Sequence, residues 1–374
     1  MRSTALLLTK NCAGFKGAKV FTNQMCRIGF FTLNNNQNVS LKIINSDNIK
    51  HFSDYFSLVN LGNYSEGTNI GNLFREITNN HVRYVLLNDI FNPIELFRYR
   101  NRFALDVNFI VYPYTLVLYK EYCSKMAGYL QKEDIIISFS NFLRNVLKNI
   151  PCKCIMPKIP VSIDTKEFRR SDMGPKKELK ILFCGRIIPE KGLHLILMAL
   201  DMLKNNCRFS LHIITPRESL NQKEIKYYML IKKIISQYGL DRYVKFYGSL
   251  INNQNKRREI FSEADVLVYL STDREETFGR NIVEGFAAGL AVIISDWQAI
   301  NELVVNDRNG IVVPIKGSHG INVQEIALAI IKMYDRKLLN RFKQNNYLKS
   351  KEYDYRPHMK ELRKIIGLNT SKAK

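Results

Sequence analysis

The chain has 374 residues with 46% hydrophobic and 11% aromatic content, which excludes a disordered protein and allows two domains with separate cores. Its net charge of +22 favours polyanionic partners such as nucleotide diphosphates, acidic membrane surfaces or nucleic acid, although a compositionally biased genome explains the same lysine content. No apolar stretch approaches the roughly 20 residues needed to span a bilayer, so any membrane contact is expected to be peripheral.

The first half of the chain alternates strand and helix patterns, which is typical of a doubly wound α/β domain. We expect a first strand over residues 5–9, because residues 9–11 break the apolar run too early for a signal peptide. A loop over residues 11–17 then precedes a helix expected over residues 18–31. Further strands are predicted over residues 39–44, 84–87, 109–112, 135–138 and 155–161.

A second α/β unit is predicted after residues 169–177, which combine charge, glycine and proline as linkers do. An amphipathic pattern predicts a helix over residues 223–238, and another helix follows Gly192 to about residue 204. The strands of this unit are predicted over residues 179–183, 209–214, 244–248, 266–270, 291–295 and 310–314.

The most informative segment is 276–284, Glu-Thr-Phe-Gly-Arg-Asn-Ile-Val-Glu. Glu276 is predicted in a loop and Glu284 in the short helix that follows, which Gly289 ends. A carboxylate just before a helix start lies beside free backbone N–H groups that hold anions. The carboxylate can accept hydrogen bonds from hydroxyl groups, and the helix start can bind phosphate. This combination suits a sugar nucleotide.

A second block lies upstream, at residues 185–192, Gly-Arg-Ile-Ile-Pro-Glu-Lys-Gly. Arg186 and Lys191 flank a predicted strand-to-helix turn, and ligands of open α/β sheets bind at such carboxyl ends of strands. Two cations there can neutralise a diphosphate as it becomes a leaving group. The alternative is that both are solvated loop cations and that Glu276 is an ordinary first-turn carboxylate. Glu284 has core-like neighbours, so its charge is costly unless something binds it.

Together the two blocks resemble the paired-glutamate signature of retaining glycosyltransferases with the GT-B fold, most closely glycosyltransferase family 4. The resemblance implies an α/β architecture of two Rossmann-like, doubly wound parallel-sheet domains that face a cleft. The N-terminal, acceptor-side domain would span residues 1–170 and the nucleotide-sugar-binding domain residues 178–352. In similar proteins the C-terminal helix, here residues 355–368, returns to the first domain.

Site residues follow from the same resemblance. It implies that Arg186 and Lys191 bind the donor diphosphate, that Glu276 contacts the transferred sugar, and that Glu284 contacts the ribose. Phe278, Gly279 and Arg280 would complete the donor site. Tyr247, Gly248 and Ser249 match the position where relatives hold the base, although core packing is an equal alternative for Tyr247.

The first domain contributes a further expected element, a turn bracketed by Gly14 and Gly17 with Lys16 as an added cation. Relatives have a glycine-rich loop there that faces the donor phosphates and the acceptor, but such turns are also often purely structural. Tyr114 stands near the position where many relatives carry a histidine that contacts the donor sugar. The sequence departs from the family again where residues 215–218 replace a glycine loop and Leu270 replaces a proline.

The expected activity is transfer of a sugar from a UDP- or GDP-sugar to a hydroxyl of a glycan or lipid-linked acceptor, with retention. No cofactor is expected beyond this co-substrate, and no His/Cys/Asp cluster has metal-ligand spacing. The seven irregularly spaced cysteines favour reduced thiols in a cytoplasmic protein, with peripheral contact at the anionic inner face of the membrane as a further expectation.

Other functions remain open alternatives. The missing histidine would fit a catalytically silent relative that binds nucleotides or glycans. The charge would fit a basic polyanion-binding protein, but no recognisable nucleic-acid module is present. A phosphorylase of the same fold needs a pyridoxal lysine that nothing in the sequence singles out, and epimerases lack the close pair of glutamates.

Overall fold

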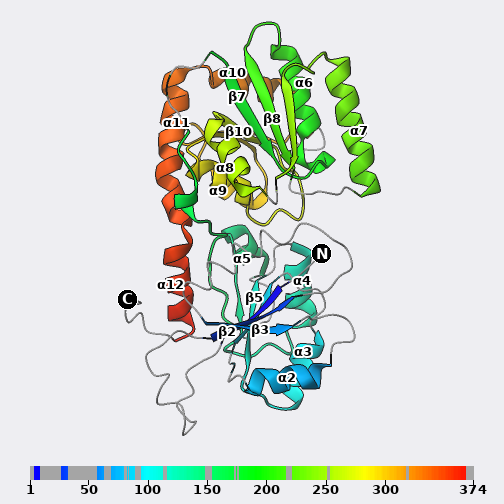
Figure 1. The fold of residues 1–374 in the computed structure, drawn as a ribbon, viewed down its shortest axis with the longest axis vertical. Coiled ribbons are helices and arrows are strands. Elements are labelled where there is room, and N and C mark those ends of the chain that lie inside the picture. Colours follow the sequence, from blue (N-terminus) through cyan, green and yellow to red (C-terminus); the bar gives the residue numbers. More distant parts are fainter. Residues whose placement is uncertain are drawn as a thin grey trace. The chain divides into compact units, whose positions relative to one another are not determined.

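The computed structural model describes residues 4–8, 27–32, 57–62, 69–79, 82, 84–88, 94–112, 116–147, 154–171, 174, 177–215, 221–250, 253–316 and 320–367. The chain divides into two compact units. Unit 1 comprises residues 1–160 and 355–374, and unit 2 comprises residues 161–354. Figure 1 shows a sheet with flanking helices in each unit. Among the helices in these ranges, none combines the length and apolar character that a bilayer span requires.

The sheet of unit 1 has the strand order β3-β2-β1-β4-β5-β6, the order typical of a dinucleotide-binding fold. Strands β2 and β3 are parallel, as are β4, β5 and β6, whereas β1 runs antiparallel to both of its neighbours. The strands are β1 (Thr4–Leu8), β2 (Arg27–Thr32), β3 (Ser57–Gly62), β4 (Tyr84–Asn88), β5 (Asn108–Tyr112) and β6 (Ile135–Ile136).

Two predictions for unit 1 were wrong. The helix predicted over residues 18–31 is contradicted by β2, because Arg27–Thr32 pairs with strands on both sides. Its isoleucine and two phenylalanines favour a pleated sheet over a helix. Residues 155–161 form isolated bridges at Ile155 and Lys158 instead of the predicted strand. The strand predicted over residues 39–44 lies outside the described residues.

The described helices of unit 1 include α3, which a buried ion pair ties to the sheet. Arg100 of this helix contacts Asp134 with its Nη1 atom, 2.6 Å from Oδ1 and 2.8 Å from Oδ2. Asp134 also accepts a hydrogen bond from the backbone N–H of Phe109 in β5, so the charge of each partner is satisfied. These helices are α2 (Ile70–Asn79), α3 (Ile94–Arg102), α4 (Leu116–Lys125), α5 (Asn141–Leu147) and α12 (Tyr355–Ile365).

The sheet of unit 2 is entirely parallel, with the order β12-β11-β10-β7-β8-β9. All six strands lie where the sequence predicts them. The order of the strands along the chain reverses between the neighbours β7 and β10, which makes this the topological switch point of the sheet. The strands are β7 (Leu179–Cys184), β8 (Phe209–Thr215), β9 (Val244–Ser249), β10 (Val266–Tyr269), β11 (Ala291–Ser295) and β12 (Ile311–Val313).

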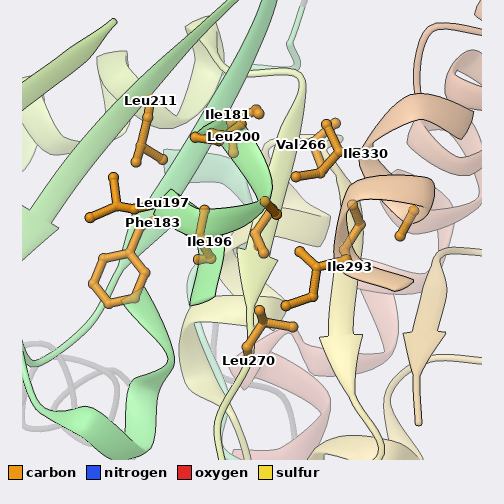
Figure 2. Packing of buried hydrophobic residues seen from close by; sticks show 14 of the residues in the cluster. Ile181, Phe183, Ile196, Leu197, Leu200, Leu211, Val266, Leu270, Ile293 and Ile330 are labelled. Carbon is orange, nitrogen blue, oxygen red and sulfur yellow. The ribbon is translucent and has the colours of Figure 1, made fainter. Parts of the chain in front are cut away.

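Helices α6, α7 and α10 share one hydrophobic core with this sheet. Figure 2 shows Ile196 and Leu200 of α6 among strand residues such as Ile181, with Ile330 of α10 on the same side. These side chains are fully buried, and each contributes about 1.5–3 kcal/mol relative to exposure. The helices of unit 2 are α6 (Leu193–Leu203), α7 (Gln222–Gln237), α8 (Gln254–Glu263), α9 (Arg280–Ala287), α10 (Val323–Lys332) and α11 (Arg336–Lys349).

Candidate functional site

The candidate site lies in unit 2, at the carboxyl ends of the neighbouring strands β7 and β10 (Figure 1). Ligands of open α/β sheets bind at such a topological switch point. The chain contributes Arg186 and Lys191 after β7, and Asp273 and Glu276 after β10. The structure therefore brings the two sequence motifs together within one unit.

Lys191 is at the centre of this site. Its ammonium nitrogen lies 2.7 Å from Glu276 Oε2 and 3.2 Å from Asp273 Oδ2. It also donates a hydrogen bond to the hydroxyl of Ser271, at 3.0 Å. The side chain is only 8% exposed, and the Tyr269 hydroxyl lies a further 3.5 Å from the same nitrogen. Lys191 is thus held in one position by both acidic residues, rather than solvated as a loop cation.

A glycine fixes the position of Lys191. The lysine ends a short 3-10 turn, η3 (Pro189–Lys191), and Gly192 follows in the left-handed region with a φ of 68°. A Cβ atom at Gly192 would lie 2.9 Å from both the backbone oxygen and the Cβ of Leu270, at the end of β10. The turn after β7 can therefore pack directly on β10 only because this residue is glycine.

Glu276 is surrounded by donors. Besides Lys191, its Oε2 atom accepts a hydrogen bond from the hydroxyl of Tyr269 and lies 3.4 Å from that of Ser271. Burial raises the pKa of Tyr269 well above its usual value, and the negative charge of Glu276 raises it further. The phenol therefore stays protonated and acts as a donor. This arrangement aims one Glu276 oxygen at Lys191.

Asp273 bridges the two basic residues of the upstream motif. Its Oδ2 atom lies 2.7 Å from Arg186 Nη2 and 3.2 Å from Lys191 Nζ. Burial would raise the pKa of the Asp273 carboxyl, but Lys191 and Arg186 outweigh it and hold that pKa below its usual value. Sequence reasoning missed Asp273. The available signal was its position in the loop after β10, three residues before Glu276.

Glu284 lies in a second cluster, on the first turns of α9. Its side chain is 4% exposed and forms ion pairs with Arg257 of α8 and with Arg280, whose Nε lies 3.1 Å from Oε1. Burial would raise the pKa of Glu284, but Arg257 and then Arg280 hold it below the usual value. Two arginines of the chain itself therefore compensate this buried charge, and the expected ribose contact stays a prediction. The sequence analysis did not identify Arg257 as one of these arginines.

Asn281 links this cluster to the end of β7. Its side-chain amide donates to the backbone oxygen of Cys184 at 2.8 Å, and its Oδ1 accepts from Arg257 at 3.2 Å. One turn of α9 therefore holds both the end of β7 and the cation that pairs with Glu284. Glu284, Asn281 and Arg257 thus form one polar network that is anchored to the end of β7.

The segment between the two glutamates is shaped by packing. Phe278 is buried, and its ring centroid lies 5.9 Å from that of Tyr353. Gly279 precedes α9 with a φ of 102°, and a Cβ atom there would lie 2.9 Å from Ile300 Cγ2. This packing therefore disfavours contact between the Phe278 side chain and a sugar-nucleotide donor. A donor contact here would come from the backbone at the start of α9.

The predicted base-binding residues lie at the end of β9. The Tyr247 hydroxyl lies 2.9 Å from Nδ1 of His212 in β8, and the two rings are stacked with centroids 5.6 Å apart. Ser210 partners the other ring nitrogen of His212, at 3.1 Å, so both ring nitrogens of this buried histidine have partners. Gly248 is exposed and Ser249 is half-buried. Base contact by these residues stays a prediction.

Four predicted site residues lie outside the described residues: Gly14, Lys16, Gly17 and Tyr114. In the part of the chain that the structure describes, no group of three or more His, Cys, Asp or Glu side chains is arranged to hold a metal ion. The expectation of reduced thiols is contradicted at Cys154, which is disulfide-bonded, whereas Cys184 and Cys207 are free. The sequence could not show this, because a disulfide depends on which thiols the fold brings together.

Comparison with protein families gives a match for residues 164–349, which fit the model of the family "Glycosyl transferases group 1". An uncharacterized glycosyltransferase of Methanocaldococcus jannaschii is 29% identical over 144 residues. That stretch covers 38% of this chain and about a third (34%) of the length of that relative. Both described clusters of the candidate site lie within residues 164–349.

Solved structures match a larger share of the chain. A glycosyltransferase from Rickettsia africae covers 86% of this chain and 88% of its own, with a TM-score of 0.64 at 17% identity. The Anabaena protein HepE, solved in complex with UDP and glucose, covers 85% of this chain and 88% of its own, with a TM-score of 0.65 at 15% identity. At such identities the likeness shows the fold alone. The predicted GT-B α/β fold is confirmed.

Proposed function

We propose that this protein is a retaining glycosyltransferase of family 4, a hexosyltransferase that uses a UDP- or GDP-sugar as donor. The acceptor would be a hydroxyl of a glycan or of a lipid-linked saccharide. The family match over residues 164–349 supports the glycosyltransferase part of this proposal. The retaining chemistry and the hexosyl donor rest on the resemblance of the two motifs.

One observation carries the proposal: Arg186, Lys191 and Glu276 converge at the switch point of the unit 2 sheet. A diphosphate at the end of β7 would lie within reach of a guanidinium and an ammonium group. Arg offers a planar bidentate fork and Lys a compact point charge, so the two can grip different phosphate oxygens. Glu276, held beside Lys191, would then face the sugar on the far side of the diphosphate.

The chemistry we infer is positioning and electrostatic stabilisation. As the bond from sugar to phosphate breaks, negative charge grows on the diphosphate, which Arg186 and Lys191 stabilise. Positive charge grows on the sugar ring, which the Glu276 carboxylate stabilises while it orients the hydroxyls. The acceptor hydroxyl attacks the same face of the sugar ring from which the diphosphate leaves. The leaving phosphate helps to remove the proton of that hydroxyl. Glu276 therefore need not form a covalent bond.

Glu284 would hold the ribose. Its Oε1 and Oε2 atoms each have an arginine partner, yet each carboxylate oxygen has a second lone pair that can accept a ribose hydroxyl. Because Arg257 and Arg280 keep the carboxylate ionised, it remains an acceptor across the neutral pH range. No metal or other cofactor is part of this proposal.

Peripheral contact with an anionic membrane is a further part of the proposal, and α7 supports it. This helix has four exposed lysines, and its one acidic residue, Glu224, is buried as part of the N-terminal capping box. Ile225, Met229 and Leu230 are exposed on the same helix. Exposed aliphatic side chains interspersed with lysines suit a surface of anionic lipid headgroups. Such a location would place a cytoplasmic enzyme next to lipid-linked acceptors.

The test is a panel of UDP- and GDP-sugars, scored by hydrolysis without an acceptor. We expect one donor to be hydrolysed by the wild-type protein and Glu276→Gln to lower that rate about 100-fold or more, with a smaller effect on UDP or GDP affinity. Glu275→Gln is the matched control, because it removes the adjacent carboxylate and should keep most of the activity. A Glu276→Gln protein with the wild-type rate would overturn the role of Glu276. Donor binding without any turnover would favour a catalytically silent binding protein.

A further inference from the structure

Asp273 has no role in the donor site implied by the sequence, yet it occupies the position between the two cations of that site. We propose that the Asp273 carboxylate is a built-in competitor of the donor diphosphate, which weakens nucleotide binding and speeds its release. This inference rests on the proposed function, because it assigns Arg186 and Lys191 to the diphosphate. Asp273 would lower the affinity for the nucleotide, whereas the neighbouring Arg186 and Lys191 would raise it.

The competition follows from how the charges are shared. A single oxygen, Asp273 Oδ2, lies 2.7 Å from Arg186 Nη2 and 3.2 Å from Lys191 Nζ. Lys191 also pairs with Glu276 at 2.7 Å, so two carboxylates already surround one ammonium group. A diphosphate that reaches these cations must share them with Asp273 or displace it. Either outcome reduces the net gain from binding.

The carboxylate of Asp273 is anchored, which makes its escape from an incoming anion difficult. Its other oxygen, Oδ1, accepts a hydrogen bond from the backbone N–H of Glu275 at 3.0 Å. The backbone oxygen of Asp273 accepts from Trp297 Nε1 at 2.9 Å and from the N–H of Glu276 at 3.0 Å. Because both side chain and backbone are held, the negative charge stays within a few ångströms of the bound phosphates. Repulsion between Asp273 and the phosphates therefore always opposes nucleotide binding.

This placement has a functional consequence. A site that gripped the diphosphate with Arg186 and Lys191 alone would bind the nucleoside diphosphate product at least as tightly as the donor, because the freed terminal phosphate carries more negative charge. Product release limits turnover in many enzymes, so uncompensated cations would slow it. Asp273 offsets part of their attraction, and it restores the internal ion pairs as the nucleotide leaves. We infer that it sets the residence time of the product.

The test measures nucleotide binding by Asp273→Asn, which keeps the side-chain shape and an oxygen for the Glu275 N–H. We expect UDP or GDP, whichever the wild type binds, and inorganic pyrophosphate to bind about tenfold tighter, with slower dissociation in stopped flow. Uridine or guanosine, which lack phosphates, should bind as to the wild type. Asp273→Glu, which restores the charge, should return the affinity toward the wild-type value.

Asp296→Asn is the matched control, because it removes the same charge from the loop after β11. Asp296 is exposed and accepts a hydrogen bond from Asn301 at 2.6 Å, and it contacts neither Arg186 nor Lys191. We expect the nucleotide affinity of this variant to change by less than about twofold, because solvent screens the charge of Asp296. Equal tightening by both variants would mean that overall charge, and not the bridge, governs affinity, and would overturn the inference.

Failure of the inference can be told apart from failure of the proposed function. If the wild type binds UDP or GDP and Arg186→Met abolishes binding, but Asp273→Asn binds no more tightly, the inference is wrong and the function stands. If the wild type binds neither nucleotide, the proposed function fails and the inference with it. Should Asp273→Asn not fold, Asp273→Ser keeps an acceptor for the Glu275 N–H without the charge, and the same tightening is expected.

Discussion

Glu284 is kept ionised by arginines from two helices, Arg257 of α8 and Arg280 of α9. Removing one partner of a buried ion pair leaves the other charge without compensation, which costs far more than the pair itself contributes. We therefore expect Arg257→Met to lower the free energy of unfolding by about 3–5 kcal/mol, measured by urea denaturation at pH 7. Arg258→Met is the control, because Arg258 and its partner Glu167 are 21% and 27% exposed and loss of their ion pair should cost less than about 1 kcal/mol.

The same ion pair predicts a pH dependence of stability. The pKa of Glu284 is lower in the folded protein than its ordinary 4.5, so its contribution to stability is present above that value and lost as pH falls. The free energy of unfolding should thus decline as pH falls below about 4.5 in the wild type. In Arg257→Met this decline should be shallower, because less of the pKa depression remains. An unchanged slope between pH 5 and pH 3 would contradict the role given to Arg257.

How far individual residues could be predicted depended on their local pattern. Arg186, Lys191, Glu276 and Glu284 belong to short motifs, and the structure places them in two polar clusters of unit 2. Arg257 lies in the polar run Asn-Lys-Arg-Arg-Glu, which is typical of a solvated helix face. A signal was present, since Arg257 precedes the buried Ile260 and Phe261 by three and four residues and so shares their face. Its partner on another helix could not be read from the sequence.

At the scale of elements, the turn from β7 to α6 depends on Gly192. This residue has a φ of 68°, and a Cβ atom there would lie 2.9 Å from the backbone oxygen of Leu270. Gly192→Ala should therefore push the turn away from β10 and move Lys191 from Glu276. We expect donor turnover to fall at least tenfold and the free energy of unfolding to fall by about 1–3 kcal/mol.

Gly239→Ala separates backbone strain from loss of close packing as the cause of these changes in turnover and stability. Gly239 also has a positive φ, 60°, but nothing lies within 4 Å of a Cβ atom there, and it is far in sequence from the motif residues. This variant should lose about 1 kcal/mol of stability from backbone strain and keep its turnover. If both variants lost turnover equally, close packing of Gly192 on β10 would not explain the position of Lys191.

Helix α7 gives a prediction about membranes. We expect the protein to co-sediment with vesicles of phosphatidylcholine containing 30% phosphatidylglycerol (about a third anionic lipid), and not with phosphatidylcholine alone. Replacing Lys226 and Lys233 by glutamine should weaken binding by about 1 kcal/mol per residue, and Met229→Ser should weaken it further. Replacing Lys360 and Lys364 of α12 by glutamine removes equal charge and is the control. Binding that is insensitive to Met229→Ser would favour an acidic protein partner over a lipid surface.

The elements of unit 2 were predictable because apolar runs and glycines mark every strand and turn. All six strands lie where the apolar runs predict them, and Gly289, with a φ of 69°, ends α9 as expected. Unit 1 was harder. Its β2 contains Gly29 and begins with Arg27, which weakens the strand pattern, and pairing with β1 and β3 decides its structure. Long-range pairing of this kind is not visible in a local window of sequence.

For the whole molecule, the division into two units predicts how a ligand acts on stability. Each unit has its own six-stranded sheet, and both described clusters of the candidate site lie in unit 2, residues 161–354. A nucleoside diphosphate that binds Arg186 and Lys191 should thus stabilise unit 2 more than unit 1. At a concentration of about 100 times Kd the stabilisation is about 2.7 kcal/mol, a rise in Tm of roughly 5–10 °C for a unit of this size.

Hydrogen exchange of the full chain can locate this effect. With UDP or GDP we expect slower exchange in β7, β10 and α9 of unit 2, and little change in β4, β5 and α3 of unit 1. Arg186→Met should remove the difference, because the diphosphate would lose a partner. Equal protection of both units would mean that they unfold as one cooperative body or that unit 1 binds the nucleotide as well. Gly14, Lys16 and Gly17 are the predicted unit 1 contacts, so Lys16→Gln can distinguish these two explanations. If this variant were protected in unit 2 but no longer in unit 1, the loop that contains Lys16 would be the second contact.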